Sequence, residues 1–553
     1  MAGTIDTATA DIVAKDSKRH ILLVFAGLMV TMLLSSLDQT IFSTALPTIV
    51  GELKGVDHML WVTTAYILAS TIMLPVYGKV GDLIGRKGLF IGAIVIFMLG
   101  SVIGGLAPNM AWLIAGRAVQ GLGGGGLMIL AQAIIADVVP ARERGKYMGI
   151  IGGVFALSSV AGPLLGGWFT ESIGWRWAFW MNIPLGILAV VSAALFLNLP
   201  KNTSKTLRLD FSGMLLLAIT STALVLLTTW GGTTYGWGSP VILSLIAGSL
   251  IAGVSFVLVE RKAQEPIMPL HLFKERNFNL TTAAGLIIGI AMFGALAYLP
   301  TYLQMVTAVS ATKAGLMMIP MMAALLTSSV ITGRLVSKTG RYKWFPVAGT
   351  TIVIVALVLL STMSPTMPVW LLCSYLGIMG LGLGMSMQIL VLIVQNSFHI
   401  SQVGTATASN NYFRQIGASL GAAVVGTLFT AKLTQLLAEK LPATGTGTAG
   451  GSNSFTPDLV NHLPKNIHDI VVSSYNEALT PVFLYMVPLV AIAVVLLCFV
   501  EEKPLATTIK RDMAPESLEV DGAEHVRIDK KDFGRRQSKG SGYHARLAYA
   551  ASK

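Results

Sequence analysis

Long runs of apolar residues alternate with short polar segments along most of the chain. A helix that crosses a membrane needs roughly 20 apolar residues, and fourteen runs come close to or exceed that length. The runs are continuous rather than alternating, which favours helices over the strands of a membrane barrel. The predicted spans are 21–46, 59–78, 88–107, 111–135, 147–169, 178–198, 210–230, 240–259, 280–304, 313–335, 345–363, 369–395, 404–430 and 481–500.

Lysine and arginine are concentrated in every second loop between these spans. The rich segments precede span one and follow spans two, four, six, eight and ten, with residues such as Lys18, Arg86 and Arg144. The alternate loops hold little besides Lys54, Arg176 and Lys313 before the last one. Because basic loops stay on the cytoplasmic side, the pattern predicts that both termini are cytoplasmic.

A glycine pattern repeats within the chain. The segment GKVGDLIGRKG, which begins at Gly78, has a counterpart in GRLVSKTGRYK, which begins 255 residues later at Gly333. The same offset places Gly404, Gly417 and Gly421 opposite Gly149, Gly162 and Gly166. A shared offset at several glycines indicates two related halves, an arrangement typical of transporters that alternate access around a midplane site.

The repeat divides the chain into two halves joined by an insertion. We expect an all-α integral membrane protein with two pseudo-symmetric six-helix bundles and two inserted central helices. Its predicted parts are a cytoplasmic segment (1–20), the first bundle (21–198), a linker with the inserted helices (199–276), the second bundle (277–500) with a long outer loop (431–480), and a disordered cytoplasmic tail (501–553). The outer loop is predicted to hold a flexible Gly/Thr/Ser-rich linker and a short amphipathic helix near 465–478.

Composition agrees with this class. Of the 553 residues 54% are hydrophobic and only 12% are charged, about half the charge of a soluble domain, and the mean hydropathy is +0.70. The net charge of +12 lies mostly in the topogenic loops, so we expect no nucleic-acid partner. Cys373 and Cys498 both lie in apolar runs, so neither a disulfide framework nor a metal site is expected. No phosphate-binding loop of the P-loop type occurs, which argues against direct use of ATP.

The segment from Gly145 to Gly167, GKYMGIIGGVFALSSVAGPLLGG, combines apolar character with regularly spaced glycines. Gly145, Gly149 and Gly153 share one helix face, as do Gly162 and Gly166, so neighbouring backbones can approach closely. Pro163 permits a bend, whereas its counterpart in the second half is Ala418. The segment is either a packing helix or one that also shapes the coupling half.

Two ionisable residues each stand alone in an apolar run. Asp38 lies in span one and Arg117 in span four. A charge inside a membrane costs several kcal/mol, so it needs a partner or a function. We interpret Asp38 as the residue that exchanges protons and Arg117 as its tuning partner. The alternatives are a polar residue near the outer interface and an arginine bonded to backbone carbonyls.

Several motifs resemble those of the major facilitator superfamily. GKVGDLIGRKG is similar to its loop two–three signature, Arg117-Ala118-Val119-Gln120-Gly121 to its span-four signature, and Gly162-Pro163-Leu164-Leu165-Gly166-Gly167 to its antiporter motif. Leu37-Asp38-Gln39-Thr40-Ile41 resembles span one of the fourteen-span drug:proton antiporters, and Trp175-Arg176-Trp177 with Asn182-Ile183-Pro184 resembles the segment leading into their span six.

The resemblance implies roles for further residues. It implies an antiporter motif formed by Gly153, Gly162, Pro163, Gly166 and Gly167. It also implies a cytoplasmic gate formed by Gly78, Asp82, Gly85, Arg86, Lys87, Asp137 and Arg144, although these charges could be topology determinants alone. Ser337 stands where the first half has Asp82, so we expect the gate to be asymmetric.

Candidate cavity residues are polar, aromatic or flexible side chains in the spans. They are Tyr66, Gln120, Phe293, Tyr298, Tyr302, Gln388, Asn411 and Arg414. Packing between helices is the competing interpretation for Asn411 and Arg414, and packing or lipid contact is the competing interpretation for the aromatic residues. Some fourteen-span exporters of cationic drugs carry acidic residues in spans ten or thirteen. None occurs in either span here, which argues against a strong preference for dications.

These observations predict a proton-coupled multidrug efflux antiporter that exports small amphipathic or hydrophobic compounds. We expect a monomer in the bacterial cytoplasmic membrane, with no cofactor, powered by the proton gradient, and no enzymatic activity. An exporter of a lipid, amino acid or other metabolite on the same fold is the first alternative. A non-transporting membrane sensor is more remote, because it needs no buried titratable residue.

Overall fold

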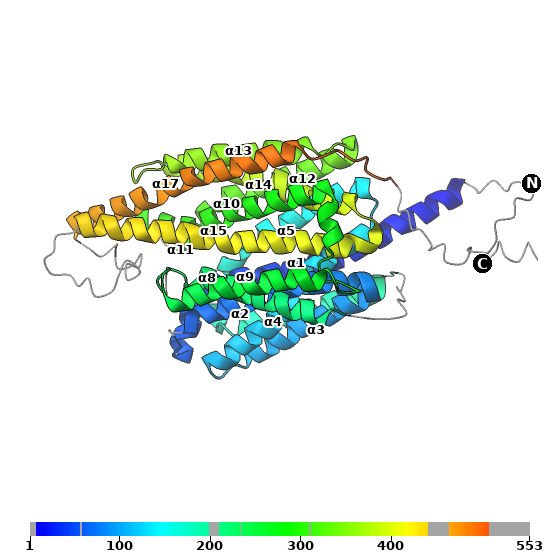
Figure 1. Ribbon diagram of the computed structural model, residues 1–553, viewed down its shortest axis with the longest axis horizontal. Helices are drawn as coiled ribbons and strands as arrows, with labels where there is room; N and C mark the ends of the chain where they lie inside the picture. Colours follow the sequence, from blue (N-terminus) through cyan, green and yellow to red (C-terminus); the bar gives the residue numbers. More distant parts are fainter. Residues whose placement is uncertain are drawn as a thin grey trace, which may run out of the picture. The chain divides into compact units, whose positions relative to one another are not determined.

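A computed structural model describes residues 7–507 except 56–57, 198, 200–208, 233, 308, 310, 441–459 and 461–463. The described residues form helices joined by short connections, and no β-strand occurs among them (Figure 1). Fourteen helical segments in this part of the chain are long and apolar enough to cross a membrane. The predicted all-α class and the number of spans are therefore confirmed.

The first six spans follow one another with short turns. Their helices are α1 (Thr7–Leu53), α2 (Met59–Ile84), α3 (Arg86–Gly105), α4 (Met110–Val138), α5 (Ala141–Trp168), α6 (Trp177–Trp180) and α7 (Asn182–Phe196). A π-helical turn, Phe169–Ile173, extends α5. The predicted polar segment 1–20 is helical from Thr7 onward, because α1 runs without interruption into the first span.

Two inserted helices separate the halves. They are α8 (Phe211–Trp230) and α9 (Pro240–Glu260). The Asp210 and Ser239 side chains accept hydrogen bonds from backbone N–H groups in the first turns of α8 and α9. These N–H groups have no partner within their own helix. Ser221 of α8 bonds to Tyr412 at 2.9 Å, so the insertion packs on the second half.

The second half begins after a 3-10 turn at Leu270–Lys274. Its helices are α10 (Arg276–Val306), α11 (Ala311–Met317), α12 (Ile319–Thr339), α13 (Trp344–Ser361), α14 (Val369–Ser397), α15 (Val403–Lys440) and α17 (Lys465–Cys498). A second 3-10 turn, Ile400–Gln402, joins α14 to α15. The helix predicted near 465–478 is the beginning of α17 and continues into the last span. The predicted Gly/Thr/Ser-rich linker lies outside the described residues.

Each half has its own hydrophobic core. Leu28, Phe97 and Ile134 belong to the first, and Ile288 and Phe483 belong to the second. Other apolar side chains, such as those of Leu195, Leu250 and Ile251, are exposed. In a bilayer such surfaces face lipid, so the helices are apolar both inside and outside.

Glycines on α5 allow the two halves to touch backbone to backbone. A methyl group on Gly333 of α12 would lie 2.1 Å from the carbonyl oxygen of Gly145, and one on Gly149 would lie 2.5 Å from that of Ser329. Both distances are far shorter than a van der Waals contact, so side chains do not fit there. The close packing predicted for α5 is thus present at its interface with α12.

A short segment after the last span, Val500–Ala506, is here called the strap. Glu501 exchanges two hydrogen bonds of 2.8 Å with Asn277 at the start of α10, and the Tyr342 hydroxyl accepts from the Lys503 N–H at 2.6 Å. The Arg142 N–H of α5 donates to the Ala506 carbonyl at 3.0 Å. The disorder predicted from residue 501 therefore does not apply to the strap. The remainder of the predicted tail, from residue 508, lies outside the described residues.

Candidate functional site: a buried charge cluster and a charged latch

Asp38 and Arg117 meet inside the first half. The Asp38 side chain is 0% exposed and that of Arg117 is 2% exposed. Arg117 Nη1 lies 2.5 Å from Asp38 Oδ2. An ion pair of this kind offsets part of the cost of removing both charges from water, whereas either charge alone would be strongly unfavourable. The two charges that stand alone in their apolar runs are therefore in direct contact, as a tuning role of Arg117 requires.

Three polar residues complete what we call the Asp38 cluster. Gln120 Nε2 and Asn182 Nδ2 donate to Asp38 Oδ1 at 3.0 and 2.9 Å. The same two nitrogens donate to Ser101 Oγ at 2.6 and 3.1 Å. The carboxylate therefore accepts one charged and two neutral hydrogen bonds, all from helices α4 and α7 of the same half.

Arg117 has further contacts that fix its position. Its guanidinium carbon lies 4.3 Å from the centre of the Phe42 ring and 4.4 Å from that of Tyr66, so the cation is held between two aromatic faces. Arg117 Nε donates to the Val62 carbonyl at 3.3 Å, and Nη1 donates to Gln120 Oε1 at 2.7 Å. Tyr66 and Gln120, predicted as cavity residues, thus both contact Arg117.

The C-terminal half of α5 packs against α1 beside this cluster. A methyl group on Gly162 would lie 2.0 Å from Thr40 Oγ1, and one on Gly166 would lie 2.5 Å from the Ile41 carbonyl oxygen. Thr40 Oγ1 also donates to the Ser158 carbonyl at 2.9 Å. Gly167, by contrast, has no atom within 4 Å of an added methyl group, so it does not share this close contact.

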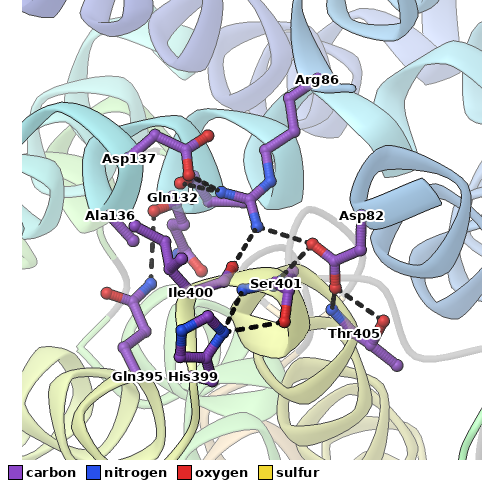
Figure 2. Close-up of polar contacts among 12 residues, drawn as sticks. Asp82, Arg86, Gln132, Ala136, Asp137, Gln395, His399, Ile400, Ser401 and Thr405 are labelled. Carbon is purple, nitrogen blue, oxygen red and sulfur yellow. Dashed lines mark hydrogen bonds and ion pairs between the residues drawn. The ribbon is translucent and has the colours of Figure 1, made fainter. Parts of the chain in front are cut away.

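A second charged cluster, the latch, lies where α2 ends and α3 begins (Figure 2). Arg86 Nη2 lies 2.6 Å from Asp82 Oδ1, and Arg86 Nη1 lies 2.5 Å from Asp137 Oδ1. The guanidinium also donates to the Ala133 carbonyl at 2.8 Å and to the Ile400 carbonyl at 3.2 Å. We refer to this end of the helix bundle as the latch end.

The latch joins the two halves. Asp82 of α2 accepts from the Thr405 N–H at 2.7 Å, from Thr405 Oγ1 at 2.8 Å and from the Gly404 N–H at 3.2 Å, at the start of α15. Gly78 lets the helices approach, because a methyl group there would lie 2.4 Å from the Ala408 Cβ. Gly85 has a φ of 92°, which a glycine adopts readily, and it separates α2 from α3.

Two predicted gate residues make their hydrogen bonds elsewhere. Arg144 donates to the carbonyls of Val139 and Ala136 at 2.9 and 2.7 Å and so holds the turn between α4 and α5. Lys87 donates to the Ala194 carbonyl at 2.9 Å, away from the latch. In the second half, Ser337 Oγ accepts from the Lys146 N–H at 3.1 Å.

The predicted cavity residues are dispersed. Tyr302 donates to Asn476 Oδ1 at 2.6 Å in the packing between α10 and α17, Tyr298 packs on Phe429, and Phe293 is partly exposed. Asn411 Nδ2 donates to Gln132 Oε1 of α4 at 3.1 Å. The buried polar residues that sequence reasoning did not assign to a site include Ser101, Asn182, Gln132, Gln395 and Thr405. Each is a polar residue in or beside a long apolar run, which is the signal that could have identified it.

Comparison with known proteins identifies the family of this chain. The family model described as the Major Facilitator Superfamily matches residues 28–422. The chain belongs to the major facilitator superfamily. Similar superfamily members include the multidrug transporter protein MdtP of Bacillus subtilis, 36% identical over 90% of this chain and 95% of that protein. Multidrug resistance protein 3 of the same organism is 32% identical over 91% of this chain and 98% of its own length.

Other superfamily proteins extend the comparison. An uncharacterised MFS-type transporter of Mycobacterium tuberculosis is 41% identical over 87% of this chain and 70% of its own length. The solved structure of the proton:xylose symporter XylE covers 88% of this chain and 98% of its own, with a TM-score of 0.57 at 15% identity. That structural likeness shows the fold alone. The chain is thus a multi-pass membrane transporter rather than an enzyme.

Proposed function

We propose that this protein is a proton-coupled antiporter that exports small amphipathic or hydrophobic compounds, as a monomer in the bacterial cytoplasmic membrane and without a cofactor. The observation that supports it is the fully buried Asp38 paired with Arg117 in the first half. A carboxylate in that position can take up a proton and thereby lose the charge that binds its partner. The relatives named as multidrug transporters and multidrug resistance proteins support the substrate class.

The cluster offers Arg117 other hydrogen-bond acceptors when Asp38 takes up a proton. Arg117 Nη1 already donates to Gln120 Oε1 at 2.7 Å, and its Nε donates to the Val62 carbonyl. Protonation of Asp38 removes the charge attraction between Asp38 of α1 and Arg117 of α4, while Arg117 keeps these acceptors within its own half. The bond between the two helices therefore changes strength without leaving the guanidinium unpaired.

Helix α5 provides a route from this cluster to the interface between the halves. Its outer part packs on α1 at Thr40 and Ile41, and its other end packs on α12 at Gly333. Movement of α1 after protonation would be transmitted along α5 to the latch end. The charge pattern of the loops supports placing the latch end in the cytoplasm. Proton entry from outside would then drive opening toward the interior.

The test uses inverted membrane vesicles that carry a proton gradient, acid inside. Addition of an exported compound to wild type is expected to dissipate the gradient, as reported by a pH-sensitive dye. Asp38→Asn is expected to abolish this response. Asp469→Asn, which makes the same change at an exposed carboxylate on α17, is the matched control and should respond as wild type does.

Two outcomes would contradict the proposal. Full proton-coupled export by Asp38→Asn would remove Asp38 from the coupling step. No response of wild type to a broad panel of amphipathic drugs would favour the alternative substrates, which a second panel of lipids, amino acids and metabolites examines. Western blotting and thermal unfolding of both variants confirm that the protein is present and folded.

A further inference from the structure

Arg414, which is partly buried, differs from the buried arginines in the atoms that accept its hydrogen bonds. Arg117 and Arg86 contact carboxylates, and Arg144 contacts two backbone carbonyls. Among the described residues, Arg414 forms no ion pair, and its one side-chain hydrogen bond runs from Nη2 to Asn411 Oδ1. A guanidinium has five N–H donors in a planar fork, so most of its donor capacity is not used by the protein.

The position of Arg414 makes this charge costly. It follows Val403, the first residue of α15, by eleven positions. At 1.5 Å per residue this is about 16 Å along the helix, roughly half of a ~30 Å hydrocarbon core. The side chain is only partly buried, so it can be reached. Intramembrane charges that lack a protein partner line pathways for substrates or ions.

A second, independent observation lies beside it. Gln132 of α4 is 0% exposed, and its Nε2 donates to no acceptor among the described residues. Its Oε1 accepts from Asn411, the same residue that accepts from Arg414. A buried amide donor without an acceptor is destabilising, so this site lacks an acceptor that a ligand can supply. Figure 2 shows Gln132 and Gln395 next to the latch.

The helices packed against α15 supply no free negative charge to Arg414. Helices α8, α10 and α14 contain no Asp or Glu, and the acidic residue of α15, Glu439, stands near its far end. Asp82 of α2 and Asp137 of α4 are paired with Arg86. Gln395, whose Nε2 donates to the Gln132 carbonyl at 3.2 Å, also has an Oε1 acceptor without a partner among the described residues. The group that suits this site is therefore an anion, with a hydroxyl or N–H nearby on the same molecule.

We propose that Arg414, with Gln132 beside it, binds the carboxylate or a similar anionic group of an amphipathic substrate. This inference rests on the proposed function, because it names the substrate class of that transporter. Charge-assisted hydrogen bonds to a planar fork are strong and specific for such groups. Because Asn411 also donates to Gln132, the anion binds next to a hydrogen bond that joins α15 of the second half to α4 of the first.

The experiment measures binding without a proton gradient. Purified full-length protein in lipid nanodiscs at pH 7.5 is titrated by equilibrium dialysis with three probes on one scaffold: 1-naphthaleneacetate, its methyl ester and 2-(1-naphthyl)ethylammonium. The variants are Arg414→Gln, which removes the charge, and Arg414→Lys, which keeps it but loses the fork. Lys432→Gln removes an exposed charge from the same helix and is the matched control.

Wild type and Lys432→Gln are expected to bind the acid at least tenfold more tightly than the ester or the ammonium probe. Arg414→Gln should lose that preference while its affinity for the ester stays within twofold, and Arg414→Lys should be intermediate. Equal loss for all three probes, failure of wild type to bind the acid, or preference of wild type for another probe would overturn the inference. Acid binding together with no proton-coupled transport in vesicles would instead refute the proposed function alone.

Discussion

Substitution of Gly333 by alanine tests whether the contact between α5 and α12 holds the latch end together. The new methyl group would lie 2.1 Å from the Gly145 carbonyl oxygen and 2.9 Å from its carbonyl carbon. Both are backbone atoms, so no side-chain rotation can relieve the clash. We expect the two helices to separate at this point.

The size of the effect follows from these distances. An ordinary contact begins near 3.4 Å, so the helices must separate by about 1.3 Å at this point. Overpacking of this kind costs about 1–3 kcal/mol, which shifts a two-state equilibrium roughly fivefold to a hundredfold or more away from the arrangement described here. Gly145→Ala places its methyl group 2.9 Å from the Gly333 carbonyl oxygen, so its effect should be smaller.

The assay measures the separation of the two helix ends directly. Spin labels are attached to cysteines introduced at Glu143 and Thr339, both exposed, after the free cysteines Cys373 and Cys498 have been replaced. Pulsed electron resonance then gives the distance distribution. Gly333→Ala should enrich the longer distances, with Gly145→Ala between it and the parent protein.

Gly167→Ala is the control for a general effect of alanine in α5, because no atom lies within 4 Å of its methyl group. It should leave the distance distribution unchanged. Identical distributions for Gly333→Ala and its parent would refute the reasoning, since they would mean that the clash relaxes within one half. Equal shifts for Gly167→Ala and Gly333→Ala would show that helix stiffening, rather than contact, is responsible.

Three further perturbations have defined outcomes. Thr405→Val removes one donor from the latch carboxylate, at a cost of about 1 kcal/mol, and should speed cysteine labelling at the latch end. The hydrogen bond from Arg176 lowers the pKa of Glu52, so its stabilising effect is complete above the unfolded pKa of about 4.3 and disappears as pH falls through the lower folded pKa. The difference in Tm between wild type and Glu52→Gln should therefore shrink below about pH 4. A chain that ends at Phe499 lacks the strap and should unfold a few degrees below one that ends at Thr507.

A specific result would contradict each of these three predictions. Thr434→Val, an exposed substitution on the same helix, should not alter labelling, and an equal effect of both substitutions would contradict the role given to Thr405. A difference in Tm that persists unchanged to pH 3 would show that the Glu52 carboxylate does not stabilise the fold through its charge. Equal unfolding temperatures of the two truncated chains would mean that the bonds of the strap contribute nothing.

The helices could be predicted from the sequence because the bilayer imposes a simple rule on them. Apolar length alone located all fourteen spans, and the single charges Asp38 and Arg117 stood out because a charge in an apolar run needs a partner or a function. The partners of neutral residues could not be predicted. Asn182 and Ser101 reach Asp38 from other helices, and hydropathy does not record which faces meet.

Residues with the same chemistry could not be assigned different roles from the sequence. Arg86, Lys87 and Arg144 lie in similar basic loops, yet only Arg86 has carboxylates on both sides. The glycine spacing of α5 indicated close packing but not its two different partners, α12 at one end and α1 at the other. Such pairings depend on the rotation of each helix about its axis, which is set by packing of the whole bundle.

The strap has a practical consequence for experiments on this transporter. Its last described bond joins Ala506 to Arg142, and therefore connects the end of the second half to the first. Fluorescent proteins or affinity tags fused at Phe499 or Val500 would displace that connection and alter the very motion they are meant to report. Fusions placed beyond Thr507 leave it intact, and a reporter there would sense whether the two halves are joined at this point.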